Sequence, residues 1–94
     1  MKVRVKTVTP EGPIDEVFTG PTAEAVVAAM QKAVASRLGF AMRFFVNAMS
    51  PSSFAHEVVK RYNQETRKSI PIPKSCDEFL KLGEQEGIVT VLEA

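Results

Sequence analysis

The chain has few of the residues that usually build chemical centres, and it has no tryptophan. Its 94 residues include 1 cysteine, 1 histidine and 1 tyrosine. A single cysteine excludes an internal disulfide, and one cysteine with one histidine cannot supply the four ligands of a structural zinc site. The sequence also has no glycine-rich phosphate loop and no nucleophile elbow. We therefore expect no metal site and no cofactor.

A charge excess and a long apolar run are also missing. The chain carries 12 basic and 11 acidic residues, for a net charge of +1. A domain that binds nucleic-acid phosphates usually shows a clear basic excess. No apolar run approaches the ~20 residues of a membrane-spanning helix, and the start, MKVRVKTV, lacks the apolar stretch of a signal peptide. We expect a cytoplasmic protein with no membrane contact, and we do not expect it to bind nucleic acid.

The composition is that of an ordinary globular protein, with 45% hydrophobic and 24% charged residues. Ninety-four residues can bury enough surface for one core without disulfide or metal staples. We expect a single domain over residues 1–94, without repeats or an interdomain linker.

Alternating β-branched residues predict strands at both ends of the chain. Val3 and Val5 face one side of the first strand, and a turn at TPEGP, with Pro10, Gly12 and Pro13, leads into a second strand, IDEVFTG. Asp15 and Glu16 should return toward the basic residues of the first strand and help to fix the hairpin register. The final strand, IVTVLE, is the most apolar, so we place it centrally or under the helices.

Capping residues and apolar periodicity predict four helices between these strands. Thr22 and Ser50 are N-cap residues, and Ser75 with Glu78 forms a capping box. The buried stripe of the first helix is expected to comprise Val27, Met30, Val34 and Leu38, with Gln31, Lys32 and Ser36 away from it. The resulting fold class is α+β in the order β-β-α-α-α-α-β, a three-stranded antiparallel sheet with the helices packed on one face.

The segment FAMRFFVNAM, residues 40–49, is apolar nearly all round as a helix, with Arg43 and Asn47 as the polar wedge suited to water. Such a helix is normally buried, but a chain this short has few elements to cover it. We therefore expect self-association, most simply as a symmetric dimer. The expected interface comprises Phe40, Phe44, Phe45 and Met49. Pairing of a free edge strand, either the first or the last, is the alternative route.

Cys76 is the candidate for thiol chemistry, because the first position of a helix can lower a thiol pKa. His56 would be its partner if the fold brought the two together. The alternative is that Cys76 is a small packing residue and His56 a solvated surface residue. No complete nucleophile arrangement is visible, so we expect an ordinary thiol.

Two further segments suggest binding. The helix after MSPSS, followed by FLKLGEQEGIVTVLE as a final helix and wing strand, resembles a winged-helix domain over less than half of the chain. That resemblance implies nucleic-acid binding, although two N-terminal strands and balanced charge oppose it. The stiff segment SIPIPKS is either a docking segment or a connector pinned to the core by Ile70 and Ile72.

The sequence therefore favours a small non-enzymatic interaction protein that acts through protein–protein contacts and forms a homodimer. A nucleic-acid-binding regulator and a thiol-dependent activity at Cys76 are the alternatives.

Overall fold

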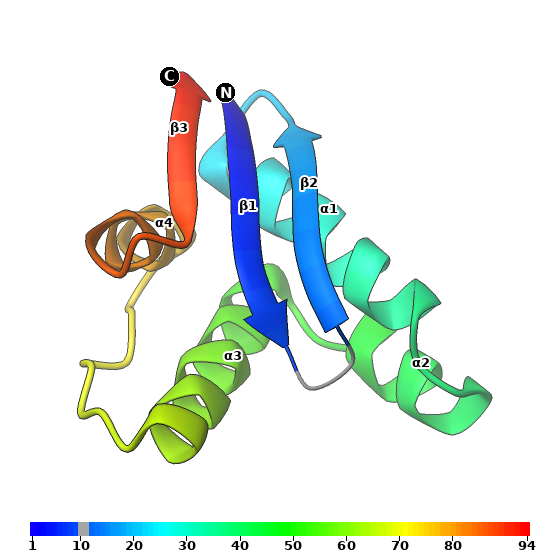
Figure 1. Cartoon of the computed structure of the whole chain (residues 1–94). Helices are drawn as coiled ribbons and strands as arrows, with labels where there is room; N and C mark the ends of the chain where they lie inside the picture. The colour runs from blue at the N-terminus through cyan, green and yellow to red at the C-terminus, as the bar shows by residue number, and fades with distance from the viewer. Residues whose placement is uncertain (10–11) are drawn as a thin grey trace.

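A three-stranded antiparallel sheet forms one layer of the protein (Figure 1). The computed structural model describes residues 1–9 and 12–94, so Pro10 of the predicted turn lies outside the described residues. Strand β1, Lys2–Thr9, forms a hairpin with β2, Gly12–Thr19, and pairs on its other side with β3, Val89–Glu93. The order β2-β1-β3 makes β1 the central strand.

The last strand is therefore an edge strand and not a central one, which was one of the two placements that the sequence left open. The hairpin turn already fixes β2 on one side of β1, so β3 can join only the opposite edge. It packs under the fourth helix, which is the other placement expected from the sequence. Val89 is buried and lies so close to Gly83 of α4, Cys76–Gln85, that a Cβ added to the glycine would meet the Val89 methyl at 2.5 Å.

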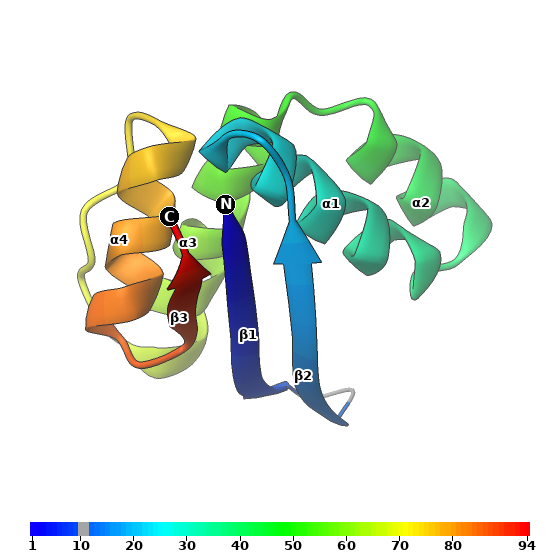
Figure 2. The ribbon, with the colours of Figure 1, turned by 90° about the horizontal axis from the view of Figure 1, so that it is seen from above.

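The helices α1, Ala23–Ser36, α2, Phe40–Asn47, α3, Pro51–Thr66, and α4 all lie on one face of the sheet (Figure 2). The predicted α+β class and the order β-β-α-α-α-α-β are confirmed. The caps are also confirmed, since the hydroxyls of Thr22, Ser50 and Ser75 each accept a hydrogen bond from a backbone N–H three residues on. None of the described helices is long and apolar enough to cross a membrane.

The core lies between the sheet and the helices. It is centred on apolar side chains from β1, β3 and the four helices, among them Val3, Val26, Val27, Met30, Val46, Phe54, Leu80 and Val89. The opposite face of the sheet is open to solvent, and there Arg4 forms a two-point ion pair with Asp15, with N–O distances of 2.7 and 2.8 Å.

Glu16 does not join Asp15 on that face, contrary to our expectation. Successive side chains of a strand point to opposite faces, so Glu16 points toward the helices. There it forms an ion pair with Arg37, the residue after α1.

The connector between α3 and α4 is held by polar contacts and one proline. The Asn63 side chain donates to the Ile70 carbonyl at 2.9 Å and accepts from the Ile70 N–H at 3.0 Å. Pro73 is fully buried, whereas Ile72 is 44% exposed. The segment is thus held through the backbone of Ile70 and the buried ring of Pro73, rather than by the Ile70 and Ile72 side chains as the connector interpretation expected.

Candidate functional site

Helix α2 turns its apolar side chains toward solvent. Phe40 is 86% exposed, Phe44 75% and Phe45 64%. Met42, three residues before Phe45 and so its neighbour on the helix, is also exposed. We call these four side chains the aromatic face. Soluble proteins normally bury phenylalanine, so a cluster of exposed aromatic rings on one helix marks a candidate interaction surface.

The polar wedge of α2 lies on the side toward α1 and is still exposed to water, as expected, while Val46 is the residue of the helix that is buried. The Arg43 guanidinium donates to the carbonyls of Ala35 and Leu38, at 3.3 and 3.4 Å. These carbonyls lie at and just beyond the C-terminal end of α1, where a cation is favourable, and the Ala35 carbonyl also accepts from the Leu38 N–H at 3.1 Å. The sequence showed the wedge but not its direction, because the direction depends on which groups of α1 require hydrogen bonds.

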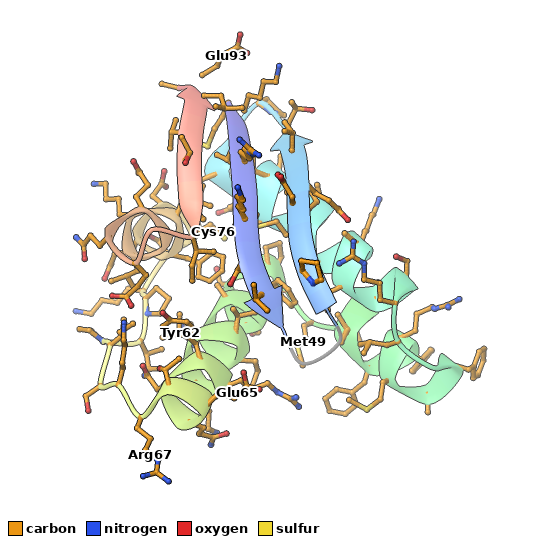
Figure 3. The ribbon with its side chains drawn as sticks, in the orientation of Figure 1. Met49, Tyr62, Glu65, Arg67, Cys76 and Glu93 are labelled. Atoms are coloured by element: carbon orange, nitrogen blue, oxygen red, sulfur yellow. The ribbon has the colours of Figure 1, made fainter. Side chains whose placement is uncertain are left out.

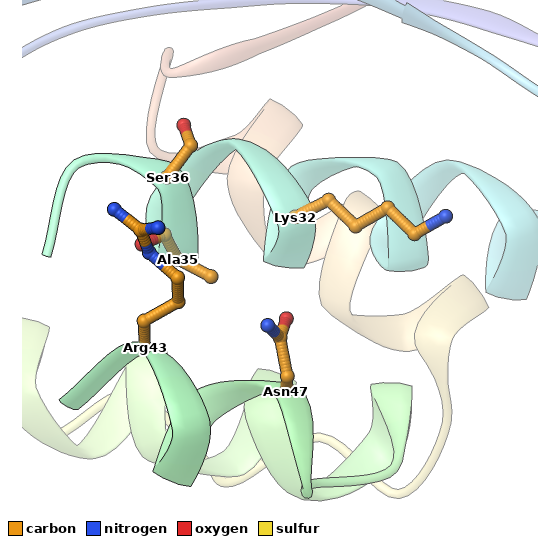
Figure 4. Close-up of a pocket in the computed structure, with 5 residues that line it drawn as sticks. All are labelled: Lys32, Ala35, Ser36, Arg43 and Asn47. Carbon is orange, nitrogen blue, oxygen red and sulfur yellow. The ribbon is translucent and has the colours of Figure 1, made fainter. Parts of the chain in front are cut away.

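Arg43 and Asn47 also line an open groove between α1 and α2, about 670 Å³ in volume. From α1, Lys32, Ala35 and Ser36 complete its lining (Figure 4). Figure 4 shows Arg43 and Asn47 rising from α2 toward α1, with Lys32 extended along α1. The groove therefore carries two basic side chains, Lys32 and Arg43, on a lining that is otherwise largely apolar, and it runs beside the aromatic face.

A buried glutamine holds α2 in this orientation. Gln31 of α1 is 6% exposed, and its amide N–H groups donate to the carbonyls of Val46, at 2.6 Å, and Met49, at 2.8 Å. Our placement of Gln31 away from the buried stripe was wrong, and Val34, assigned to that stripe, is 37% exposed. The reason is that α1 packs against α2 as well as the sheet, so its buried surface is rotated toward Gln31 and Ala35.

The structure separates the predicted interface residues. Phe40, Phe44 and Phe45 share the exposed surface of α2, whereas Met49, just after the helix, is half-buried and packs against the core (Figure 3). Met42, which the predicted interface omitted, belongs to the exposed surface. The wheel position of Met42 beside Phe45 was the signal for it.

Cys76 and His56 do not show the features of a reactive pair. Cys76 is 2% exposed, at the start of α4 (Figure 3), and His56 is exposed on α3. Burial raises the pKa of the Cys76 thiol, and the nearby carboxylates of Glu24 and Asp77 raise it further, while a hydrogen bond with Ser52 acts in the opposite direction. A raised pKa disfavours the thiolate that nucleophilic chemistry requires.

The remaining polar cluster joins α3 to the end of α4. The Tyr62 hydroxyl donates to Glu86 Oε1 at 2.9 Å, and Lys68 donates to the same oxygen while lying 5.7 Å from the centre of the Tyr62 ring. All three groups have partners, so the cluster fastens the two helices together. In the described part of the chain, no three His, Cys, Asp or Glu side chains gather as a metal site would require.

The segment that resembles the helix and wing strand of a winged-helix domain is arranged differently in this fold. Residues 76–93 form α4 and β3, and β3 is hydrogen-bonded to β1 as part of the main sheet.

In comparisons with known proteins, no family model, curated protein or solved structure matches the chain.

Proposed function

We propose that this protein is a non-enzymatic interaction domain that binds protein through the aromatic face of α2, and that it self-associates there as a symmetric dimer. The observation that carries this proposal is the solvent exposure of Phe40, Phe44 and Phe45 on one helix. Water-exposed aromatic surface is costly, and covering it provides the main favourable free energy of association.

The size of the aromatic face supports this role. At about 200 Å² per phenylalanine, the exposed fractions of Phe40, Phe44 and Phe45 amount to roughly 450 Å² of aromatic surface. That is within the range of about 300–600 Å² for the largest apolar patch on a monomeric protein, a patch that is often functional. A standard interface buries about 800 Å² per partner, so the aromatic face would form its apolar centre and the surrounding parts of α1 and α2 its rim.

A twofold arrangement fits the shape of the site. Helix α2 is 8 residues long, and it packs mainly against α1, at one end of the helical layer (Figure 2). Two copies can therefore bring their α2 helices together without moving the sheet. Edge pairing through β1, one of the alternatives raised from the sequence, is not available because β1 is paired on both sides.

Sedimentation velocity or light scattering at tens of micromolar tests the proposal, with a dimer as the expected result. Phe45→Glu should dissociate the dimer and leave the circular dichroism spectrum unchanged, because the Phe45 ring is mostly outside the monomer core. The matched control is Val8→Glu, which adds the same charge at an apolar residue 82% exposed on the sheet. A ~10 kDa monomer at every concentration would contradict self-association.

A further inference from the structure

The region around the aromatic face contains no carboxylate of its own. Residues 25–56 include no aspartate or glutamate, although the chain has 11 acidic residues. This interval covers α1 beyond its first residues, all of α2 and the start of α3. Because acidic residues are otherwise spread along the chain, the surface built from this interval differs in charge from the rest of the molecule.

The cations of the groove beside the aromatic face have no acidic partner. Within the residues that the structure describes, neither Lys32 nor Arg43 forms an ion pair with a carboxylate. Arg43 donates only to backbone carbonyls, and Lys32 is exposed on α1. The nearby Arg37 differs, since it is paired with Glu16.

The groove and the aromatic face form one continuous surface. Arg43 and Asn47 each follow a phenylalanine, Phe40 and Phe44, by three residues, and residues at this spacing are neighbours on a helix. A ligand lying across α2 would therefore contact aromatic rings on one side and the Lys32–Arg43 groove on the other.

We propose that this combined surface receives an acidic amphipathic helix of another protein. Its apolar stripe would cover the aromatic face, and its aspartate or glutamate side chains would enter the groove and pair with Lys32 and Arg43. Docking of an amphipathic helix on an apolar surface is a common mode of peptide recognition. This inference rests on the proposed function, because it uses the same face of α2.

Charge complementarity favours this partner over a second copy. A second copy brings the same uncompensated Lys32 and Arg43 and no acidic residue from this region, so a symmetric dimer places like charges around its interface. An acidic helix replaces that repulsion with attraction, which strengthens binding and accelerates encounter at low salt. It should therefore compete with self-association.

An acidic helix also suits the surface better than a lipid bilayer does. The groove is an open depression in which Lys32 and Arg43 lie beside Ala35, Ser36 and Asn47, and single carboxylate side chains can approach both cations there. The net charge of +1 gives the whole molecule little attraction to an anionic membrane.

The test uses two labelled synthetic helices of about 16 residues with the same leucine stripe, one carrying glutamate and the other lysine at its polar positions. We expect the glutamate helix to bind at least about tenfold more tightly than the lysine helix at ~50 mM salt. This difference in affinity should narrow at ~500 mM.

Lys32→Glu should weaken binding of the glutamate helix several-fold without weakening self-association. Lys81→Glu, the same change at an exposed lysine of α4, should have no such effect. Phe44→Glu should abolish binding of the helix.

The outcomes distinguish this inference from the proposed function. Equal binding of both helices, or a dimer that binds neither, would overturn the acidic partner and leave the aromatic face as a self-association site. Binding to phosphatidylserine vesicles without binding to the glutamate helix would overturn it in favour of a membrane. Glutamate-helix binding that Phe44→Glu leaves unchanged would place the helix site elsewhere and overturn the acidic-helix proposal, whereas self-association is judged separately by sedimentation.

Discussion

Gln31 of α1 donates a hydrogen bond to the carbonyl of Val46 in the last turn of α2, with 2.6 Å between nitrogen and oxygen. Val46 is also the residue that α2 buries in the core. The helix is therefore fixed at one point by both a polar and an apolar contact. This attachment explains how α2 can keep its aromatic rings in solvent without rolling over to bury them.

Replacing Gln31 should destabilise the protein more than any neighbouring surface change. Gln31→Met keeps much of the side-chain volume but removes the amide donor shared by the Val46 and Met49 carbonyls, of which Val46 keeps the bond from the Met49 N–H at 3.2 Å. We expect a loss of about 1–3 kcal/mol in the free energy of unfolding, measured by urea denaturation. Lys32→Met, at the adjacent exposed residue, should change stability by less than ~0.5 kcal/mol. Equal effects of the two substitutions would show that the glutamine does not hold α2.

Gly83→Ala should destabilise the protein, although alanine favours a helix over glycine by about 1 kcal/mol. The added Cβ would meet the Val89 methyl at 2.5 Å, and Val89 is buried in the core. Overpacking of this kind costs about 1–3 kcal/mol, so it should exceed the gain in helix propensity.

A second background provides the control for Gly83. In Val89→Ala protein the methyl at 2.5 Å is gone and only the Cβ of residue 89, at 3.1 Å, remains close, so adding Gly83→Ala should cost clearly less than in wild type. A stabilising effect of Gly83→Ala in the wild-type background would mean that α4 lies further from β3 than the structure places it.

The thiol of Cys76 should react slowly in the folded protein. Burial both excludes reagents and raises its pKa. We expect iodoacetamide labelling at pH 7 to be at least about a hundredfold slower than in urea-unfolded protein, with access limited by opening of the structure. His56→Ala should leave the rate unchanged. Rapid labelling at pH 6 that His56→Ala abolishes would instead reveal a functional dyad.

The Glu86 cluster should stabilise the protein at neutral pH and not in acid. The hydrogen bonds from Lys68 and then Tyr62 hold the pKa of Glu86 below its usual value. A lowered folded-state pKa gives a contribution that is complete above the unfolded-state pKa and disappears as the pH falls through the folded-state pKa. Glu86→Gln should therefore be less stable than wild type at pH 7, and the difference should shrink toward pH 3. A difference that is constant with pH would exclude an electrostatic contribution.

The elements that could be predicted are those specified by neighbouring residues. Ser75 with Glu78 marks a helix start, and Val3 with Val5 marks a half-buried strand, because caps and alternation act over a few residues. The orientation of Arg43 and the burial of Gln31 could not be predicted in this way. Both depend on a tertiary contact between α1 and α2, in which each side chain satisfies carbonyls of the other helix.

The candidate site was predictable in composition but not in geometry. The apolar segment at residues 40–49 indicated a surface that the rest of the chain does not cover. The same sequence pattern fits a helix with either of its sides turned toward solvent. The absence of acidic residues between positions 25 and 56 was visible in the sequence. It acquires meaning only when α1 and α2 form a groove beside the exposed rings.

The most direct test of the outward aromatic face uses the lack of tryptophan in the chain. Phe44→Trp places a single fluorescent reporter on the face, and Val8→Trp serves as an exposed control on the sheet. For Phe44→Trp we predict solvent-exposed emission in dilute solution and a shift to shorter wavelength as rising concentration drives dimer formation, with Val8→Trp unchanged. Short-wavelength emission from Trp at position 44 at every concentration would show that the ring is buried in the monomer. Exposed emission at every concentration would show that no second copy covers the face, and either result would contradict this account.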